Sequence, residues 1–327
     1  MEVVKITSGK ALLKSYSKQK KPREVFGKYI HEGELCVLFG DSNAGKSILA
    51  NDIAFFVSGG GHQWPDMVSP NIQSLYIDME MTGKQFASRY GNAAEYIPDG
   101  YSRAEVCMNT TDDKWSFIKT QIISMQGSKD APKFIVIDNI TNGFGSIFSA
   151  KRMLSLIAEM KTMKDRFGLT ILLIAHCPKR NKAKQITQDS MGGSKMILNF
   201  VDSAFAVGTS VQDESVRYVK QIKTRESEKE SLVMTVRIKD EPYLSFQYID
   251  HTCEETHIDT KTSMNLYYEI EPETEVKLVG LLMKKHDEKE KEYVSFYKIA
   301  EDLMLPVEVV IRYDYENFVK QGCGLNF

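Results

Sequence analysis

Residues 40–47 read GDSNAGKS, a spacing of glycine, lysine and serine that suits phosphate chemistry. They fit the pattern G-x-x-x-x-G-K-[ST], in which glycines let backbone N–H groups surround phosphate oxygens. Lys46 would reach the β- and γ-phosphates of a nucleotide, and the Ser47 hydroxyl would bind Mg²⁺. The pattern predicts that a nucleotide and Mg²⁺ are bound by Gly40, Asp41, Ser42, Asn43, Ala44, Gly45, Lys46 and Ser47.

The segments flanking this loop support the same prediction. Residues 35–39 are an uninterrupted apolar run, which predicts a buried strand entering the loop. Residues 48–57 carry apolar side chains at helical spacing, which predicts a helix leaving it. The N-terminus of such a helix adds partial positive charge at the phosphates. The alternative, a glycine-rich turn that matches the pattern by chance, does not explain these flanks.

Three further polar residues, Glu80, Asp138 and His176, each lie at or just past the end of an apolar run. Those runs cover residues 75–78, 134–138 and 169–175. Ligands of parallel sheets bind beyond the carboxyl ends of the strands. We therefore expect these three side chains and the phosphate-binding loop to meet at one edge of a sheet.

Helical periodicity separates the apolar runs, over residues 84–89, 115–125 and 153–163. Alternating helices and apolar strands predict an α/β fold with a mostly parallel central sheet covered by helices on both faces. Later runs alternate polar and apolar residues and predict antiparallel strands that extend the sheet, over residues 217–223, 232–238 and 244–249.

Charge is distributed unevenly along the chain. Residues 1–30 carry eight Lys or Arg against two Glu, which predicts a basic N-terminal arm that either binds phosphate or is simply solvated. The α/β domain is expected over residues 31–262. Residues 263–327 are predicted to form a small helical, helix-turn-helix-like module. Residues 265–327 have eight basic and thirteen acidic residues, which opposes DNA binding through phosphates. Protein-binding and DNA-reading roles for this module both stay open.

Bulk composition excludes several other classes of protein. The 327 residues include 42% hydrophobic and 26% charged residues with a net charge of −2, as in ordinary globular proteins. The five cysteines lack C-x-x-C spacing, so neither a zinc site nor a disulfide framework is predicted. No signal peptide or apolar run of roughly 20 residues is present, so we expect a cytoplasmic protein without a membrane partner.

The order of motifs resembles that of RecA-like ATPases. After the P-loop come DMEM, IVIDN, LIAHCPK, GSKMILNFVDS and KQIKTR, within residues 31–250. The sequence is most similar to the hexameric replicative-helicase branch, including plasmid RepA-type helicases. It also resembles the small AAA family ATPases of bacterial mobile elements. The resemblance implies a RecA-like ATPase core.

The resemblance also implies a role for each polar residue. Glu80 matches the catalytic base that activates water, and Asp138 matches the Walker B carboxylate that holds Mg²⁺. His176 matches a residue that senses the γ-phosphate. Lys223 and Arg225 match a K-x-R pair that enters the neighbouring subunit's active site, and their spacing on a strand would place both on one face. The alternatives are an ordinary exposed Glu80, an N-cap Asp138, a satisfied polar His176 and a solvated hairpin at 223–225.

Residues 179–195 lie where such motors carry a DNA-contacting loop, and they include Lys179, Arg180, Lys182 and Lys184. Basic grooves of this kind track single strands without reading sequence. The resemblance therefore implies a homo-oligomeric, hexameric ATPase of the helicase or translocase type. It would act on single-stranded DNA in replication or mobilisation of a mobile element. The alternative is a nucleotide-gated regulator or assembly factor whose C-terminal module recruits a protein, without unwinding.

Overall fold

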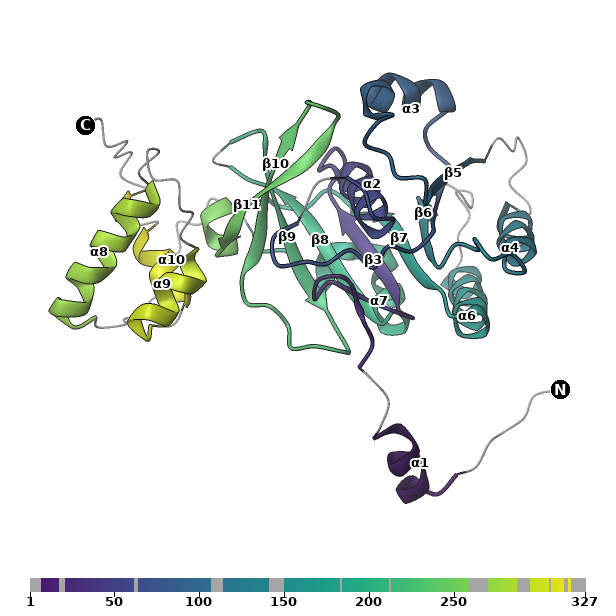
Figure 1. Ribbon diagram of the computed structural model, residues 1–327, viewed down its shortest axis with the longest axis horizontal. Coiled ribbons are helices and arrows are strands. Elements are labelled where there is room, and N and C mark those ends of the chain that lie inside the picture. The colour runs from purple at the N-terminus through teal and green to yellow at the C-terminus, as the bar shows by residue number, and fades with distance from the viewer. Residues whose placement is uncertain are drawn as a thin grey trace.

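The computed structural model describes residues 7–17, 21–61, 64–106, 114–140, 150–182, 184–211, 213–258, 270–286, 295–305, 307–314 and 317–318. Its centre is a nine-stranded sheet in the order β11-β10-β9-β8-β3-β7-β6-β4-β5 (Figure 1). The six parallel strands are β3 (Leu35–Gly40), β4 (Ser74–Asp78), β5 (Tyr101–Glu105), β6 (Phe134–Asp138), β7 (Thr170–His176) and β8 (Ser203–Thr209). The remaining three are β9 (Val216–Lys223), β10 (Val233–Lys239) and β11 (Ser245–Thr252).

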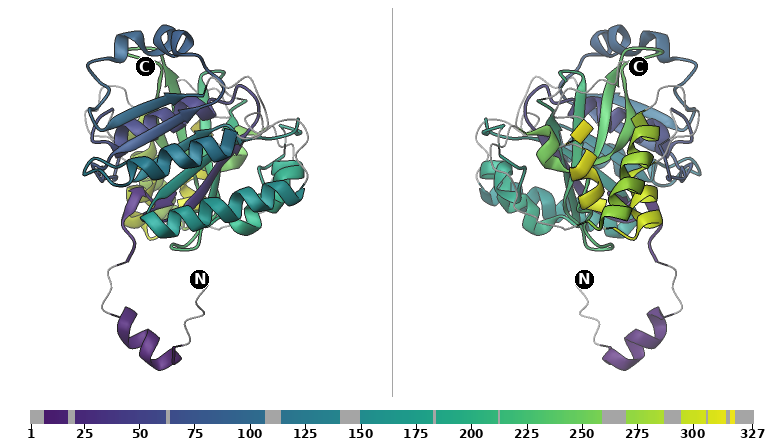
Figure 2. Two further views of the ribbon diagram at one scale, coloured as in Figure 1. Left: turned by 90° about the vertical axis from the view of Figure 1, so that its right-hand side faces the viewer. Right: turned by 90° about the vertical axis from the view of Figure 1, so that its left-hand side faces the viewer.

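Strands β8, β3, β7, β6, β4 and β5 run parallel, and helices cover both faces of this part of the sheet (Figures 1 and 2). Helix α2 (Lys46–Val57) packs on one face, in a cluster with Leu38 and Ile174. Helices α4 (Lys114–Met125), α6 (Ala150–Phe167) and α7 (Lys195–Phe200) pack on the other face. Burial on both sides explains why β3, β6 and β7 read as unbroken apolar runs.

The structure confirms the predicted α/β fold with a large, mostly parallel sheet, and it confirms the three antiparallel strands after it. Strand β5 was not predicted, because its sequence YSRAE is polar. It is the edge strand of the sheet and is only half-buried, so it needs no apolar run. The irregular loop predicted over residues 179–195 extends only to residue 187, since Gln188–Ser194 form a 3-10 helix.

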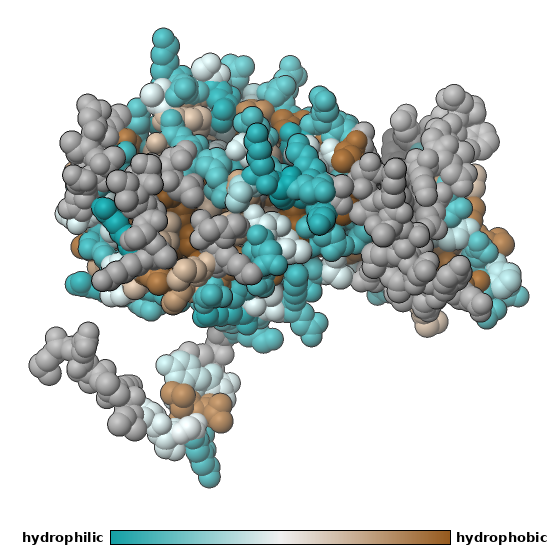
Figure 3. Space-filling model, turned by 180° about the vertical axis from the view of Figure 1, so that it is seen from behind, coloured by the Kyte–Doolittle hydropathy of each residue, from teal (hydrophilic) through white to brown (hydrophobic). Residues whose placement is uncertain are grey.

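The N-terminal segment predicted as a basic arm over residues 1–30 divides into two parts. Helix α1 (Gly9–Tyr16) has no buried residue, and it lies apart from the rest of the chain in both views of Figure 2. Figure 3 shows apolar surface on this helix, where Leu12 and Leu13 are exposed. By contrast, the hairpin of β1 (Glu24–Phe26) and β2 (Ile30–His31) is buried against the α2 face of the sheet, so these residues are not part of a solvated arm.

The C-terminal helices α8 (Pro272–His286), α9 (Phe296–Leu303) and α10 (Val307–Asp314) share a small core of their own. This core includes Leu278, Ile299 and Val310, and it contacts the body of the protein through Leu232. Lys285 also forms a 2.5 Å ion pair with Asp250 of β11. Three helices are therefore present where a helical module was predicted, while its helix-turn-helix identity stays a prediction. None of the helices described is long and apolar enough to cross a membrane.

Candidate active site

The loop between β3 and α2 has the backbone that its glycines predict. Gly45 has a left-handed φ of 96° immediately before α2, and a Cβ atom there would lie 2.7 Å from the Phe246 ring. A Cβ atom on Gly40 would lie 2.4 Å from the carbonyl oxygen of Val207 on the neighbouring strand. A side chain at either position would displace the loop, so both glycines are required by close packing as well as by conformation.

Lys46 is the first residue of α2 and its side chain is buried within the loop. Its Nζ atom donates to the carbonyl oxygens of Gly40 (3.1 Å) and Asp41 (2.8 Å). Burial lowers the pKa of Lys46, and surrounding groups, among them Asp138 and Glu80, oppose that shift. The ammonium group is thus held inside the loop, where the β- and γ-phosphates of a bound nucleotide would lie.

Asp138 ends β6 and is buried next to the P-loop. The Tyr76 hydroxyl donates to its Oδ2 atom at 2.6 Å, while its buried Oδ1 atom has no hydrogen-bond partner among the described residues. Burial raises the pKa of Asp138 to about 6, and the Tyr76 and nearby Ser47 hydroxyls oppose that rise. A carboxylate oxygen without a partner beside a serine hydroxyl fits Mg²⁺, which prefers oxygen ligands. Ser47 and Asp138 would hold the ion, which neutralises charge on the β- and γ-phosphate oxygens.

The backbone turn that carries Glu80 is fixed from both sides. Asp78 Oδ1 accepts hydrogen bonds from the N–H groups of Glu80 (3.0 Å) and Met81 (2.8 Å). Arg103 of β5 donates to Asp78 Oδ2 (2.9 Å) and to the Met81 carbonyl (2.6 Å). Helix α3 (Gly83–Tyr90) follows and begins with a capping box. Asp78 and Arg103 were not identified from the sequence, and they restrict where the Glu80 carboxylate can lie.

Glu80 meets residues from two other strand ends. Its Oε1 atom accepts a hydrogen bond from Asn139 and lies 3.2 Å from His176 Nε2. The Glu80 and His176 side chains are each 31% exposed, so water can reach this carboxylate. Asn139 follows directly on Asp138, at the end of an apolar run, and that position is the sequence signal by which it could have been found.

A cleft of about 310 Å³ brings these groups together. Its lining residues are Asn43, Gly45, Lys46, Ser47, Ile48, Glu80, Met81, Arg89, Asp138 and His176. The four groups expected at one sheet edge therefore do converge. Arg89, an exposed residue in the last turn of α3, was not predicted to be part of the site. Helical periodicity alone did not show that this side of α3 faces the P-loop.

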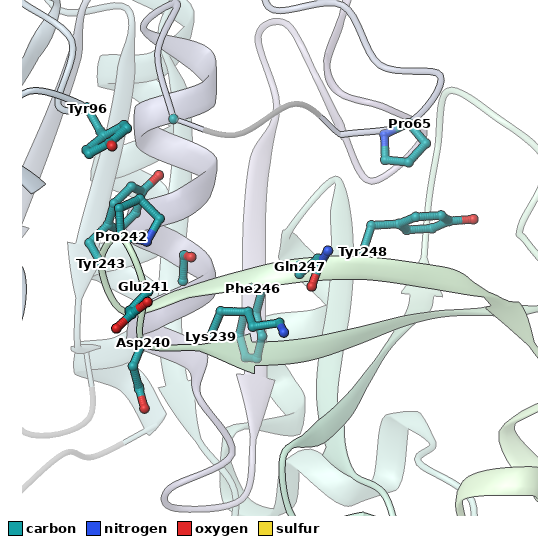
Figure 4. Close-up of a pocket in the computed structure, with 12 residues that line it drawn as sticks. Pro65, Tyr96, Lys239, Asp240, Glu241, Pro242, Tyr243, Phe246, Gln247 and Tyr248 are labelled. Carbon is teal, nitrogen blue, oxygen red and sulfur yellow. The ribbon is translucent and has the colours of Figure 1, made fainter. Parts of the chain in front are cut away.

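A larger cavity of about 1050 Å³ lies between the β10–β11 hairpin and the segments around Pro65 and Tyr96 (Figure 4). No P-loop residue lines it. The two sites are linked through Phe246, which lines this cavity and also packs against Gly45. We assign phosphate chemistry to the smaller cleft, because the lysine, the carboxylates and the histidine are there.

A family model described as an AAA domain, AAA_25, matches residues 11–182, slightly more than half of the chain. The matched region contains the P-loop, Glu80, Asp138 and His176. The chain belongs to this AAA domain family. It is accordingly a P-loop ATPase that binds a nucleotide, which in such proteins is usually accompanied by Mg²⁺. No curated protein matches the sequence.

Lys223 and Arg225 of this AAA domain ATPase lie away from the cleft. Lys223 is the last residue of β9, and its Nζ atom donates to the carbonyl oxygens of Leu198 (2.6 Å) and Val201 (2.7 Å). Arg225 lies beyond the strand, so the expectation that a strand aligns the two cations is wrong. Arg225 pairs at 2.9 Å with Asp202, a residue that also accepts from the N–H group at the start of β3. Both cations therefore lie near the amino-terminal ends of the parallel strands, at the end of the sheet opposite the P-loop.

The basic segment after β7 is only partly available for binding. Lys179, Lys182 and Lys184 are exposed. Arg180 is not: its Nε atom lies 3.2 Å from Asp41 Oδ2 in the P-loop, and the two side chains are 10% and 13% exposed. The prediction that all four cations face DNA therefore has to be corrected for Arg180.

Proposed function

We propose that this ATPase is a RecA-like ring ATPase that hydrolyses ATP while acting on single-stranded DNA, in the manner of a helicase or translocase. The observation that carries the proposal is the position of the basic segment. Its first exposed lysine, Lys179, lies three residues after His176, which contacts Glu80 in the cleft. A DNA-binding segment in this position can alter the group that activates water.

In the proposed reaction Glu80 acts as the general base that orients and deprotonates the attacking water. Its carboxylate is fixed by the turn at Asp78 and by Asn139, so little reorganisation is needed once ATP is bound. Lys46 lies beside the β- and γ-phosphates and stabilises the charge that develops on the transferred group. His176 connects the Glu80 carboxylate to the segment that follows β7.

The proposed ring rests on Lys223 and Arg225. Neither residue lines the cleft of its own subunit, and both are near the opposite end of the sheet. A neighbouring subunit that placed this end of the sheet against the cleft would supply Arg225 as the cation that the transition state needs, whereas Lys223 would first have to leave the carbonyl oxygens of Leu198 and Val201. Arg225 is suited to this, because its side chain is 49% exposed despite the contact with Asp202. A hexamer, and a role in replication or mobilisation of a mobile element, follow only from the motif resemblance.

ATP turnover with and without single-stranded DNA tests the proposal. With saturating Mg²⁺–ATP, unstructured oligothymidylate should raise the turnover rate of the full-length protein at least several-fold. Duplex DNA of the same length serves as the control and should stimulate less. A turnover rate that DNA leaves unchanged, measured at salt concentrations where DNA binding is demonstrated, would rule out a DNA-driven motor.

A second function, a nucleotide-gated regulator that recruits a protein, is favoured by the C-terminal helices. They have a core separate from the apolar clusters on the two faces of the sheet, and they expose large apolar residues such as Val276 (73%) and Met304 (92%). Such side chains suit a protein partner better than a phosphate backbone. Two results would support this function instead: slow ATP turnover that single-stranded DNA does not stimulate, and a protein partner that binds only when ATP is bound.

A further inference from the structure

The P-loop of this protein contains a carboxylate. Asp41 directly follows Gly40, and its side chain is 13% exposed. Neither of its carboxylate oxygens has a hydrogen-bond partner among the described residues, although its carbonyl oxygen accepts from Lys46. A buried negative charge in a loop that binds a polyanion disfavours binding, because like charges repel strongly where water is excluded.

Arg180 supplies the compensating charge. Its Nε atom lies 3.2 Å from Asp41 Oδ2, and its side chain is 10% exposed. Cys177 lies against the same loop, since its N–H group donates to the carbonyl oxygen of Gly40 at 3.2 Å. Burial raises the pKa of the Cys177 thiol to about 11, Asp41 raises it further, and Lys46 and Arg180 oppose the rise. Asp41, Lys46, Cys177 and Arg180 therefore share one electrostatic environment.

The segment that carries Arg180 is anchored at its other end as well. The N–H group of Ile186 donates to Glu254 Oε1 at 2.6 Å, and Gln185 donates to Glu255. Arg180 Nη1 also donates to the carbonyl oxygen of Lys184 at 3.0 Å, which draws the segment into a closed loop. Exposed lysines thus lie on a short strap, here defined as residues 180–182 and 184–186, that is tied to the P-loop by Arg180.

We propose that Arg180 is a positioning residue of the ATP site: it neutralises Asp41 and couples the strap to the P-loop. DNA phosphates drawn to Lys182 and Lys184 also attract the neighbouring guanidinium, so strap occupancy changes the Arg180–Asp41 contact and hence the affinity for ATP. By linkage, ATP changes the affinity for DNA by the same factor. The coupling to DNA rests on the proposed function, whereas the effect of Arg180 on ATP affinity does not.

A double-mutant cycle tests whether Arg180 supports ATP binding by neutralising Asp41. The dissociation constant of Mg²⁺–ATP is measured for the full-length protein and for Arg180→Gln, Asp41→Asn and the double variant. Arg180→Gln should weaken ATP binding about tenfold, because Asp41 is left buried and unpaired. The double variant should recover to within about threefold of wild type, because the uncompensated charge is gone. Equal weakening in Arg180→Gln and in the double variant would overturn the proposal.

Two matched variants separate charge from structure. Arg180→Lys keeps the charge and should stay within about threefold of wild type; a loss as large as that of Arg180→Gln would overturn the proposal. Lys129→Gln removes an exposed cation far from the P-loop along the chain and should leave ATP affinity unchanged. Thermal unfolding midpoints of all variants show whether each is folded at the temperature of the assay.

Oligothymidylate tests the coupling. In the wild type it should shift the ATP dissociation constant by a factor of about five or more, and in Arg180→Gln this factor should approach one. A factor unchanged by Arg180→Gln would overturn the coupling while leaving the proposed function intact. A wild-type protein that binds ATP but not DNA would overturn both the DNA-dependent function and the coupling. Only the effect of Arg180 on ATP affinity, which the double-mutant cycle measures, would then remain.

Discussion

His176 Nε2 lies 3.2 Å from Glu80 Oε1, although the two residues are 96 positions apart in the sequence. Glu80 follows β4, whereas His176 is the last residue of β7, and these two strands are separated in the sheet only by β6. The contact links the group proposed to activate water with the start of the basic segment. Variants at Glu80 should therefore separate the chemical step from the binding of ATP.

Glu80→Gln should retain ATP binding and lower the turnover rate by about 100-fold or more, because an amide cannot accept the proton of water. Lys46→Ala should instead abolish nucleotide binding, because it removes the cation at the phosphates. Glu95→Gln is the matched control, since Glu95 is exposed and does not line the cleft. ATP binding and single-turnover hydrolysis measure both effects. Near-normal hydrolysis by Glu80→Gln would show that Glu80 is not the general base and that another residue activates water.

Replacing Lys179, Lys182 and Lys184 together by glutamine should weaken binding to single-stranded DNA. The slope of log affinity against log salt should become shallower by about 0.7 for each DNA phosphate that the variant no longer neutralises. Arg180 is left out of this variant because it contacts Asp41. Affinity for ATP should change less than threefold, since these exposed lysines do not line the cleft.

The matched control for this experiment replaces Lys10, Lys14 and Lys21, which are exposed lysines of the N-terminal segment. The first variant could leave DNA affinity and its salt dependence unchanged, while the control lowers both. That result would show that DNA binds to the N-terminal segment instead of residues 179–184.

His257 makes the stability of the fold depend on pH. It is buried, contacts Thr252 at 2.7 Å and Ser210 at 3.0 Å, and stacks on Tyr218. Burial lowers its pKa to about 4, whereas a histidine in the unfolded chain has a pKa of about 6.5. Between these values the unfolded state binds more protons, so the free energy of unfolding decreases as pH falls from about 6.5 to 4.

This contribution is on the order of 3 kcal/mol over the whole window, at 1.36 kcal/mol for each unit of pKa difference. Urea unfolding of wild type and His257→Gln at several pH values between 4.5 and 7 measures it. The difference in stability between the two proteins should shrink toward acid pH, because only the wild type loses this contribution. A difference that is constant with pH would show that His257 is not held neutral by the fold.

Much of the α/β core and the convergence of the cleft were predictable from sequence, because parallel strands place their carboxyl ends at one edge. The unbroken apolar runs at β3, β6 and β7 reflect burial on both faces. The polar sequence of β5 gives no such signal, so that strand was missed. Arg103 of β5, which fixes the turn before Glu80, was missed with it.

Contacts between distant side chains were not predictable, because charge and periodicity do not specify partners. Arg180 and Asp41 are 139 positions apart, and from sequence Arg180 looked like its exposed lysine neighbours. Lys223 likewise looked like a free cation, yet it is bonded to the carbonyl oxygens of Leu198 and Val201. In both cases the fold brings together groups whose pairing decides their availability.

The Arg225–Asp202 contact gives the sharpest test of a ring. An Arg225→Ala protein loses only a half-exposed ion pair, so it should fold, bind ATP and assemble. It should nevertheless hydrolyse ATP poorly, because an arginine supplied by a neighbour can be worth about 10³–10⁵ in rate. This follows from the proposal that Arg225 completes the adjacent cleft, since Arg225 does not line its own.

Mixing Arg225→Ala with Glu80→Gln distinguishes that arrangement from a defect within one subunit. In mixed assemblies some interfaces pair an intact Glu80 in one subunit with an intact Arg225 from the next, and these should hydrolyse ATP. Turnover is measured across a titration of the two variants under conditions where subunits exchange. Arg225→Ala mixed with Lys46→Ala is a second pairing that should also recover activity. Activity that never exceeds the sum of the separate variants, despite demonstrated mixing, would leave Arg225 as a surface residue paired with Asp202.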